Sequence, residues 1–475
     1  MLAAWLLSMR PVAATLKHDR GTLLLRQVPD AVAELFSWDA RAQMWRAPGQ
    51  RYREVMERLR AADASIQDEA AEFGKLEMVV SREIAPYPHQ REALAAWKAA
   101  GRRGVVVLPT GAGKTLVAQL AMRDTPRSTL ITVPTIDLLE QWYTGLLAMF
   151  PDVNVGMLGG GSHDETPILV STYDSAAIHA ETLANRYALL ICDEVHHLPS
   201  DFTRVIAEYS LAPYRLGLTA TPGRSDGREV DLDTLIGPVV YSKSPAELKG
   251  GALADYREVR IMVRLSPHEQ AHYDTLIAER NAFLTTAGIQ LGSPDGWTKF
   301  VLSSGSPAGR RAMLAHREAR SLAYGTEGKL RVLDELLNQH PEARMLIFTD
   351  DNAMVYRVSR EFLLPAITHQ TPVKERHELL THFRSGQYRR MVTSRVLNEG
   401  IDVPEASIAV ILSGTATERE QIQRLGRILR KGEGKQAILY EVVTEGTSEE
   451  RVSKQRRGEW KPRSAPVWED VNAPD

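Results

Sequence analysis

Cysteine is nearly absent from this sequence, since Cys192 is the only one among 475 residues. A single thiol excludes an intramolecular disulfide and a zinc site built from several cysteines. This composition is typical of proteins that work in a reducing compartment. We therefore expect a cytoplasmic location.

Long apolar runs are absent as well. No stretch reaches the roughly 18 apolar residues that a helix needs to cross a bilayer. The apolar opening at residues 1–7 is short, and no basic segment precedes it as a secretory signal peptide would require. We therefore expect neither a signal peptide nor a membrane contact.

An excess of one charge is also missing. Lys and Arg number 58 and Asp and Glu number 60, so the formal net charge is −2 at pH 7. No positive field extends over the whole protein, and any nucleic acid must be held by a local surface and by neutral donors. Apolar residues at 43% and charged residues at 25% are the ordinary balance of a globular protein with a packed core.

The order of apolar runs divides the chain into blocks. Short apolar runs alternate with amphipathic helical patterns over residues 81–245 and again over residues 323–450, as in parallel α/β sheets. Residues 1–80 predict a small α+β domain, residues 255–322 a helix-rich insertion and residues 451–475 a mobile tail. The predicted fold class is therefore α/β, with two parallel-sheet domains and two smaller parts.

The small N-terminal block has a simple pattern. A turn at residues 19–21 precedes a strand-like run at residues 22–25, and a charged helical pattern covers residues 52–71. We predict one strand and one long helix from these two patterns.

The sharpest local signal is a glycine-rich turn between an apolar strand pattern and a helix pattern. In such a turn, backbone N–H groups wrap a phosphate chain, and the helix N-terminus adds its positive dipole end. Lys114 is expected to reach the β- and γ-phosphates of ATP, and the Thr115 hydroxyl to ligate Mg²⁺. A chance turn is the alternative, but both flanks and the Lys-Thr pair disfavour it. The other phosphate-binding positions are Thr110, Gly111, Ala112 and Gly113.

Two adjacent acids follow the apolar residues 189–192. This places them at the C-terminal end of a strand, where ligands bind in open parallel sheets. Asp193 is expected to hold Mg²⁺, and Glu194 to orient or deprotonate the attacking water. A solvated turn is the alternative for two acids alone. His196 and His197 lack a further ligand cluster, so we interpret His196 as a polar link between the ATP site and its neighbours.

A third short strand pattern ends in two hydroxyls, Thr219 and Thr221. Such a turn alone is more often structural. It gains meaning as the third element in this order, which predicts that the two threonines couple the nucleotide site to other parts of the protein.

Arginines in the second α/β block complete the pattern. Arg424, Arg427 and Arg430 recur at three-residue spacing and so lie along one helix face. A solvated basic face is the alternative. However, the γ-phosphoryl group needs cations to stabilise its charge, and such arginine fingers contribute roughly 10³ to 10⁵ in rate. If Arg427 and Arg430 come from the other block, hydrolysis requires the blocks to close, which predicts an ATP-driven motor.

The order of these elements resembles that of superfamily 2 helicases. Within that superfamily the sequence resembles the XPB (Rad25-type) DNA repair helicases, in their compact archaeal and bacterial form. The segments that carry the resemblance are residues 87–90, 133–135, 140–142, 170–176, 193–199, 214–221, 365–369, 397–404 and 423–430.

The resemblance implies an architecture and an activity. The architecture has two RecA-like domains, a small N-terminal damage-recognition domain and a helical thumb that grips DNA, although the helical segment is also consistent with a spacer between the domains. The activity is that of an ATP-dependent DNA helicase or translocase of repair, which uses ATP and Mg²⁺ and moves 3′ to 5′. The expected partners are double-stranded, forked or bubble DNA and a nuclease.

The resemblance also implies roles for individual residues. Gln90 would read the adenine, and Asp402 would help to hold the nucleotide from the second RecA-like domain. Hydroxyl groups suit contacts to the DNA backbone, because such contacts position a strand without reading its sequence. The backbone contacts would be Thr135, Thr172 and Thr393, and the coupling residues His196, Thr219, Thr221 and Gln423.

One loop departs from the family's pattern. The family carries an Arg-Glu-Asp loop implicated in DNA opening, whereas the corresponding residues here are Arg224, Ser225 and Asp226. We keep Arg224 and Asp226 as DNA-binding candidates and expect altered efficiency of duplex opening. Two other functions stay open at this point: the motor of a restriction system, and a nucleotide-gated module that binds damaged DNA without unwinding it.

Overall fold

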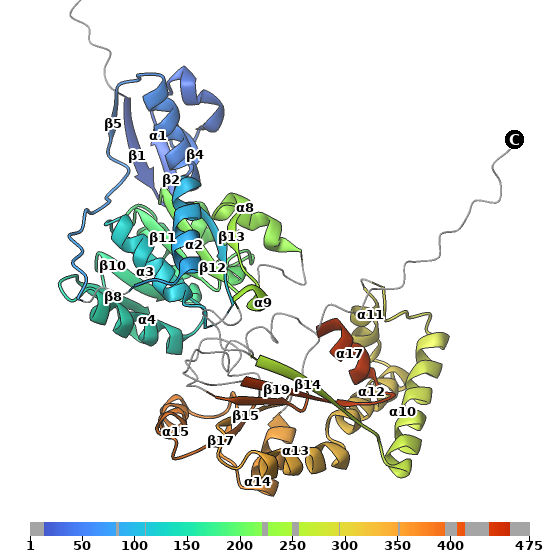
Figure 1. Ribbon diagram of the computed structural model, residues 1–475. Helices are drawn as coiled ribbons and strands as arrows, with labels where there is room; N and C mark the ends of the chain where they lie inside the picture. Colours follow the sequence, from blue (N-terminus) through green and yellow to red (C-terminus); the bar gives the residue numbers. More distant parts are fainter. Residues whose placement is uncertain are drawn as a thin grey trace, which may run out of the picture. The chain divides into compact units, whose positions relative to one another are not determined.

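The computed structural model describes most of the chain in two compact units, Met1–Leu248 and Lys249–Asp475 (Figure 1). No helix in the described part of the chain is both long enough and apolar enough to cross a bilayer. The described residues are 14–81, 85–109, 111–220, 227–248, 256–293, 295–349, 352–394, 406–413 and 437–456.

The first unit begins with a small domain built on a five-stranded sheet of order β3-β4-β2-β1-β5. Arg20 and Gly21 both have positive φ, 46° and 77°, which suits the tight turn between β1 and β2. Helix α1 covers Tyr52–Ala61 and buries Val55 and Leu59 against this sheet. The strands are β1 Ala14–Asp19, β2 Thr22–Leu25, β3 Ser37–Asp39, β4 Met44–Pro48 and β5 Ile66–Asp68.

The long helix predicted at residues 52–71 is therefore wrong in its second half. Asp63 takes a left-handed conformation with φ 52°, and Ala64 N donates to Leu59 O at 3.0 Å, which closes the helix end. The chain then forms β5, which pairs parallel to β1.

The small domain is fixed to the sheet domain that follows it in the same unit (blue beside cyan and green in Figure 1). Arg53 Nη1 donates to the carbonyls of Gly101 and Pro213, at 2.6 and 3.2 Å. Gly21 lies against the Tyr209 ring so closely that an added Cβ would come within 2.3 Å of it. These contacts join the two domains within one compact unit.

The next domain is an eight-stranded sheet of order β13-β6-β12-β11-β7-β10-β8-β9. All strand pairs are parallel except the β8–β9 hairpin. Strand β11 is buried throughout, as expected where helices cover both faces of a parallel sheet. The strands are β6 Arg103–Val107, β7 Thr129–Val133, β8 Val155–Gly159, β9 Ser162–His163, β10 Ile168–Thr172, β11 Leu189–Asp193, β12 Tyr214–Thr219 and β13 Val239–Ser242. The helices are α2 Pro88–Ala99, α3 Lys114–Asp124, α4 Ile136–Met149, α5 Tyr173–Ile178, α6 Ala180–Leu183, α7 Val205–Tyr209, α8 Leu232–Leu235 and α9 Pro245–Leu248.

The second unit contains a six-stranded, all-parallel sheet of order β14-β19-β18-β15-β17-β16. Two α/β domains with parallel sheets are thus present, as the sequence predicted. The strands are β14 Tyr256–Val263, β15 Met345–Phe348, β16 Ala366–Ile367, β17 Arg390–Thr393, β18 Ile408–Ile411 and β19 Ala437–Thr444. The helices beside them are α13 Glu327–Gln339, α14 Asn352–Phe362, α15 Val373–Ser385 and α17 Ser448–Arg456.

A buried ion pair joins three elements of this second domain. Lys329 on α13 and Glu449 on α17 are 0% and 2% exposed, and Lys329 Nζ lies 2.6 Å from both carboxylate oxygens. The same ammonium donates to the Leu412 carbonyl after β18. Helix α17 extends to Arg456, so the predicted tail at residues 451–475 begins inside a helix, and the rest of that tail lies outside the described residues.

Three helices precede α13 within the same unit: α10 Pro267–Thr286, α11 Gly296–Ser303 and α12 Pro307–Tyr324. Helix α10 starts with a capping box between Ser266 and Glu269. Tyr273 packs on α12, and its hydroxyl accepts from Ser448 N at 3.0 Å. These contacts hold the helical segment to the second domain, and its grip on DNA stays a prediction.

Candidate functional site

Several predicted site residues meet at the carboxyl edge of the first sheet. Strands β6, β12 and β11 are neighbours, with Val107 paired to Thr219 and Asp193 paired to Leu218. The register therefore brings the phosphate loop after β6, the acids at the end of β11 and Thr219 to one edge.

The phosphate loop needs its glycines for conformation and for space. Gly111 and Gly113 have φ of 83° and 80°, a region that other residues rarely adopt. A Cβ on Gly113 would also come within 2.2 Å of Gln90 Nε2. Gly113 is the N-cap of α3, so the loop passes directly into a helix N-terminus, which favours anions.

Lys114 is the cation beside this loop. Its Nζ donates to the Leu108 carbonyl at 3.2 Å and lies 4.0 Å from Glu194 Oε1, with its side chain 10% exposed. The ammonium is thus held between the strand end and the acids, where the phosphates of a nucleotide are expected.

The Asp193 carboxylate is held by two donors. Trp142 Nε1 donates to Oδ2 at 2.8 Å, and the Glu194 backbone N–H donates to Oδ1 at 3.0 Å. The Tyr173 hydroxyl donates to the main-chain carbonyl of Asp193 at 2.9 Å. The sequence pattern did not predict roles for Trp142 or Tyr173, although both lie in segments that carry the family resemblance.

Glu194 has a strained backbone and an available acceptor atom. Its φ and ψ of 48° and 54° place it in the left-handed region, where a non-glycine residue costs free energy and often marks a functional site. Its buried Oε2 atom accepts no hydrogen bond within the described part of the chain. A buried carboxylate oxygen that lacks a donor fits the expected role of binding a water molecule.

His196 lies between the acids and the third motif. Its Nδ1 is 3.1 Å from Thr219 Oγ1 and 3.6 Å from Glu194 Oε2. The ring is buried, so these contacts connect the end of β11 with the end of β12. This geometry supports our interpretation of His196 as a polar link.

The residues at this edge fit Mg²⁺. The described residues include no group of three or more His, Cys, Asp or Glu side chains that suits a metal. Mg²⁺ needs fewer protein ligands, because it usually keeps several waters and binds through one or two carboxylates plus substrate phosphates. The carboxylate of Asp193, the nearby Thr115 at the start of α3 and the unsatisfied Glu194 oxygen are consistent with that ion.

Gln90 is engaged by the protein at both ends of its amide. Nε2 donates to the Ala112 carbonyl at 2.9 Å, and Oε1 accepts from Tyr87 N at 2.9 Å. His89 Nε2 contacts the same Ala112 carbonyl at 2.9 Å, a loop contact that the sequence did not predict. In this structure Gln90 supports the phosphate loop, and its contact with adenine stays a prediction.

The threonines predicted to contact DNA differ in their surroundings. Thr135 and Thr172 are half-buried N-caps of α4 and α5, whose hydroxyls accept from Leu138 N and Ser175 N. The N-terminus of α4, a helix of 14 residues, favours phosphate groups. Thr393 at the end of β17 is fully buried, and its hydroxyl donates to the Ser394 carbonyl. A DNA contact by Thr393 would require this strand end to be uncovered.

Eight predicted site residues lie outside the described part of the chain, so their roles remain predictions. They are Thr110, Thr221, Arg224, Asp226, Asp402, Gln423, Arg427 and Arg430.

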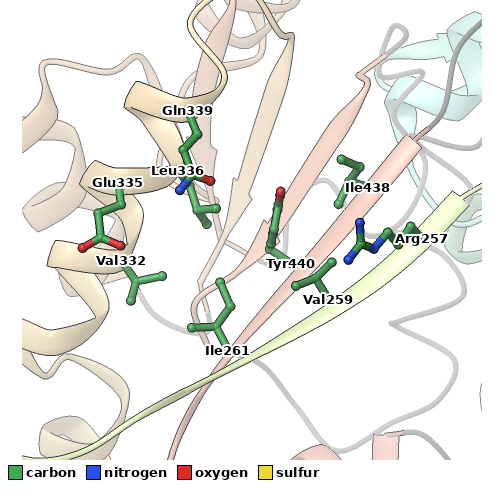
Figure 2. Close-up of a pocket in the computed structure, with 9 residues that line it drawn as sticks. All are labelled: Arg257, Val259, Ile261, Val332, Glu335, Leu336, Gln339, Ile438 and Tyr440. Carbon is green, nitrogen blue, oxygen red and sulfur yellow. The ribbon is translucent and has the colours of Figure 1, made fainter.

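A cavity of about 300 Å³ lies away from the predicted motifs, in the second unit (Figure 2). Figure 2 shows its lining on three elements, with Val332 and Leu336 on α13, Val259 and Ile261 on β14, and Tyr440 on β19. Its nine lining residues mix five aliphatic side chains with polar ones, including Arg257 and Glu335, and none of them is a predicted site residue. We assign no chemistry to it.

The environment of Asp193 predicts a dependence of stability on pH. Burial and the adjacent Glu194 carboxylate raise the pKa of Asp193 from 3.8 to about 6, against the opposing effects of Lys114 and Trp142. Because the folded pKa exceeds the unfolded one, this group contributes stability at low pH that is lost as pH rises through about 6. Without Mg²⁺, the ionised Asp193 therefore destabilises the fold at pH 8.

We expect Asp193→Asn to be more stable than the wild type at pH 8 in EDTA, because the amide has no charge to bury. That advantage should shrink by about 1 kcal/mol at pH 5, where the wild-type carboxyl is largely protonated. Urea unfolding at both pH values measures the difference. An advantage that is independent of pH would contradict a raised pKa at this position.

Family models match three parts of the chain. The model described as the res subunit of type III restriction enzymes matches residues 83–224, and the helicase conserved C-terminal domain matches residues 328–432. The xeroderma pigmentosum group B helicase damage recognition domain matches residues 16–70.

One relative matches almost the whole chain. The DNA 3′-5′ translocase XPB2 of Sulfurisphaera tokodaii is 39% identical over 443 residues, which cover 93% of this chain and 99% of that protein. This chain belongs to the XPB family. The DNA 3′-5′ helicase XPB of Mycobacterium tuberculosis is 33% identical over 357 residues, which cover 72% of this chain and 58% of that longer protein.

The fold agrees with this membership. The helicase domain of Pyrococcus furiosus Hef superposes with a TM-score of 0.54 at 19% identity, covering 80% of this chain and 100% of that domain. The two parallel-sheet domains are RecA-like helicase domains, as predicted. A restriction-type motor is not favoured, because the relatives are XPB proteins and the N-terminal domain matches the XPB damage recognition model.

Proposed function

We propose that this XPB-family chain is a DNA motor, which hydrolyses ATP at the carboxyl edge of its first sheet to move 3′ to 5′ along DNA. The observation that carries the proposal is the cluster of Lys114 with the buried Asp193 and Glu194 beside the phosphate loop. The names of the relatives, DNA 3′-5′ translocase and DNA 3′-5′ helicase, support the polarity and the substrate.

Each residue of the cluster has a distinct task in this proposal. Lys114 binds the β- and γ-phosphates, and Asp193 with Thr115 holds Mg²⁺. Bound Mg²⁺ would neutralise negative charge on the phosphates. Glu194 accepts a hydrogen bond from the attacking water and takes its proton, and the contact of His196 with Thr219 transmits the state of this carboxylate to the end of β12.

The second RecA-like domain completes the nucleotide site in this proposal. Arg427 and Arg430 stabilise charge on the γ-phosphoryl group, and Asp402 helps to hold the nucleotide. Gln423 and Thr221 couple ATP hydrolysis to movement. Gln90 reads the adenine. Hydrolysis then depends on contact between the two domains.

DNA is held along the predicted backbone contacts, with Thr135 and Thr172 at two helix N-termini of the first domain and Thr393 in the second. We propose that strand separation is weaker than translocation, because the Arg224-Ser225-Asp226 loop lacks the family's central acid. Forked or bubble DNA is the proposed substrate, and a nuclease the proposed partner.

Three assays on the same protein test these proposals. DNA should stimulate ATP hydrolysis, and the motor should displace a third strand from a triplex when it approaches 3′ to 5′. Displacement of a strand from a 3′-tailed duplex should be slower, and Ser225→Glu should speed it without changing ATP turnover. Stimulated hydrolysis without triplex displacement would favour the nucleotide-gated binding module instead.

A further inference from the structure

Two helices of the first RecA-like domain share an arrangement that the assigned roles do not use. Helices α4 and α5 each start at a threonine that we place on the DNA backbone, Thr135 or Thr172. Each helix also carries a buried side chain that hydrogen-bonds to the same residue, Asp193.

The route through α4 runs along one helix. Thr135 is the N-cap, and Trp142 follows on the second turn, so the two residues are separated by about 10 Å along the helix axis. The Trp142 indole is 2% exposed and donates to Asp193 Oδ2 at 2.8 Å. Any shift of α4 when DNA binds its N-terminus therefore reaches the carboxylate directly.

The route through α5 is shorter. Thr172 is the N-cap, and the next residue, Tyr173, is 4% exposed and donates to the Asp193 main-chain carbonyl at 2.9 Å. This bond fixes the end of β11, whereas the Trp142 bond fixes the carboxylate rotamer. Together they hold both the backbone and the side chain of Asp193.

The two bonds matter because a metal-binding carboxylate must present the correct lone pairs. Asp193 Oδ1 already accepts from the Glu194 N–H at 3.0 Å, so the Trp142 bond decides how the second oxygen is oriented. Outer donors of this type typically change metal affinity or activity by 10- to 100-fold when they are removed.

We propose that Trp142 and Tyr173 are positioning residues, through which DNA bound at Thr135 and Thr172 aligns Asp193 for ATP hydrolysis. The inference rests on the proposed function, because it takes Thr135 and Thr172 as DNA contacts and Asp193 as the Mg²⁺ ligand. DNA stimulation of the ATPase then passes in part through two defined hydrogen bonds within one domain.

Tyr173→Phe is the sharpest test, since it removes one hydroxyl and keeps the ring. Its matched control is Tyr187→Phe. Tyr187 lies just before β11, is also 4% exposed and belongs to the same core cluster. Its hydroxyl donates to the Thr166 carbonyl at 3.1 Å. Both variants should fold alike in thermal unfolding. Only Tyr173→Phe should lower the DNA-stimulated kcat, by about 10-fold, with the KM for ATP within about twofold of the wild type.

Trp142→Phe tests the other route, with Trp97→Phe as its control. Trp97 is a fully buried indole that donates to the Arg215 carbonyl at 2.8 Å, near the start of β12. Trp142→Phe should raise the Mg²⁺ concentration for half-maximal activity about 10-fold or more, and Trp97→Phe should not.

The outcomes distinguish the positioning roles from the proposed motor function. If the wild type is stimulated by DNA but the Tyr173 and Trp142 variants match their controls in stimulation and Mg²⁺ requirement, the positioning roles are overturned and the motor stands. If DNA does not stimulate the wild type at all, the proposed function and the positioning roles fall together.

Discussion

Lys114→Ala should abolish ATP hydrolysis while leaving DNA affinity nearly unchanged. The Lys114 ammonium donates to the carbonyl of Leu108, which follows β6, and it lies 4.0 Å from Glu194 Oε1. Its removal takes away charge stabilisation of the transferred phosphoryl group, for which a loss of at least about 100-fold in kcat is typical. Neither α4 nor α5 carries Lys114, so the predicted backbone contacts of Thr135 and Thr172 stay in place.

The measurement combines steady-state ATP hydrolysis with fluorescence anisotropy of labelled DNA. A matched control is Lys98→Ala, because Lys98 pairs with Asp124 at 2.5 Å on the surface of the same domain, where an ion pair contributes little. Turnover should be unchanged in that variant. Wild-type turnover in Lys114→Ala would contradict the assignment of this loop as the phosphate-binding loop.

The nucleotide edge of the first domain was predictable from sequence because its parts are local. A strand, a glycine turn and a helix start are contiguous around Lys114, and Asp193 directly follows four apolar residues, so chain order alone places these residues at strand ends. The parallel sheet then brings those ends together, as the register of β6, β12 and β11 shows.

Contacts that cross from a helix to a distant strand were not predictable. Trp142 contacts Asp193 because its indole points from α4 toward the end of β11. A hydrophobic pattern in the sequence predicts only that this residue is buried. Gln90 is similar: its helix was expected, but its hydrogen bond to Ala112 depends on how closely α2 approaches the loop.

The predicted length of the N-terminal helix was wrong for a different reason. The polar pattern after residue 61 continues a helical period, while a single left-handed residue, Asp63, ends the helix, and pairing with β1 then extends the chain at Ile66. Tertiary pairing outweighed local propensity there.

Arg427→Ala should depress turnover far more than ATP binding. An arginine finger acts on charge that develops in the transition state, so its loss lowers kcat, whereas ground-state binding depends mainly on the phosphate loop and Lys114. We expect kcat to fall by about 10³-fold and the dissociation constant for ATP to change by less than about fivefold. Single-turnover hydrolysis and equilibrium titration with a fluorescent ATP analogue measure the two quantities separately.

Arg427→Lys distinguishes a finger from a simple positive charge. Lysine keeps the charge but lacks the planar guanidinium fork that binds phosphate oxygens through two hydrogen bonds. A finger predicts that lysine restores little of the lost rate, whereas a solvated basic face predicts full activity in both variants. Equal losses of kcat and ATP affinity would instead place Arg427 in ground-state binding. The two-domain site would then lose the step that makes hydrolysis depend on domain closure. A residue that binds the ground state and the transition state equally cannot couple the chemistry to movement.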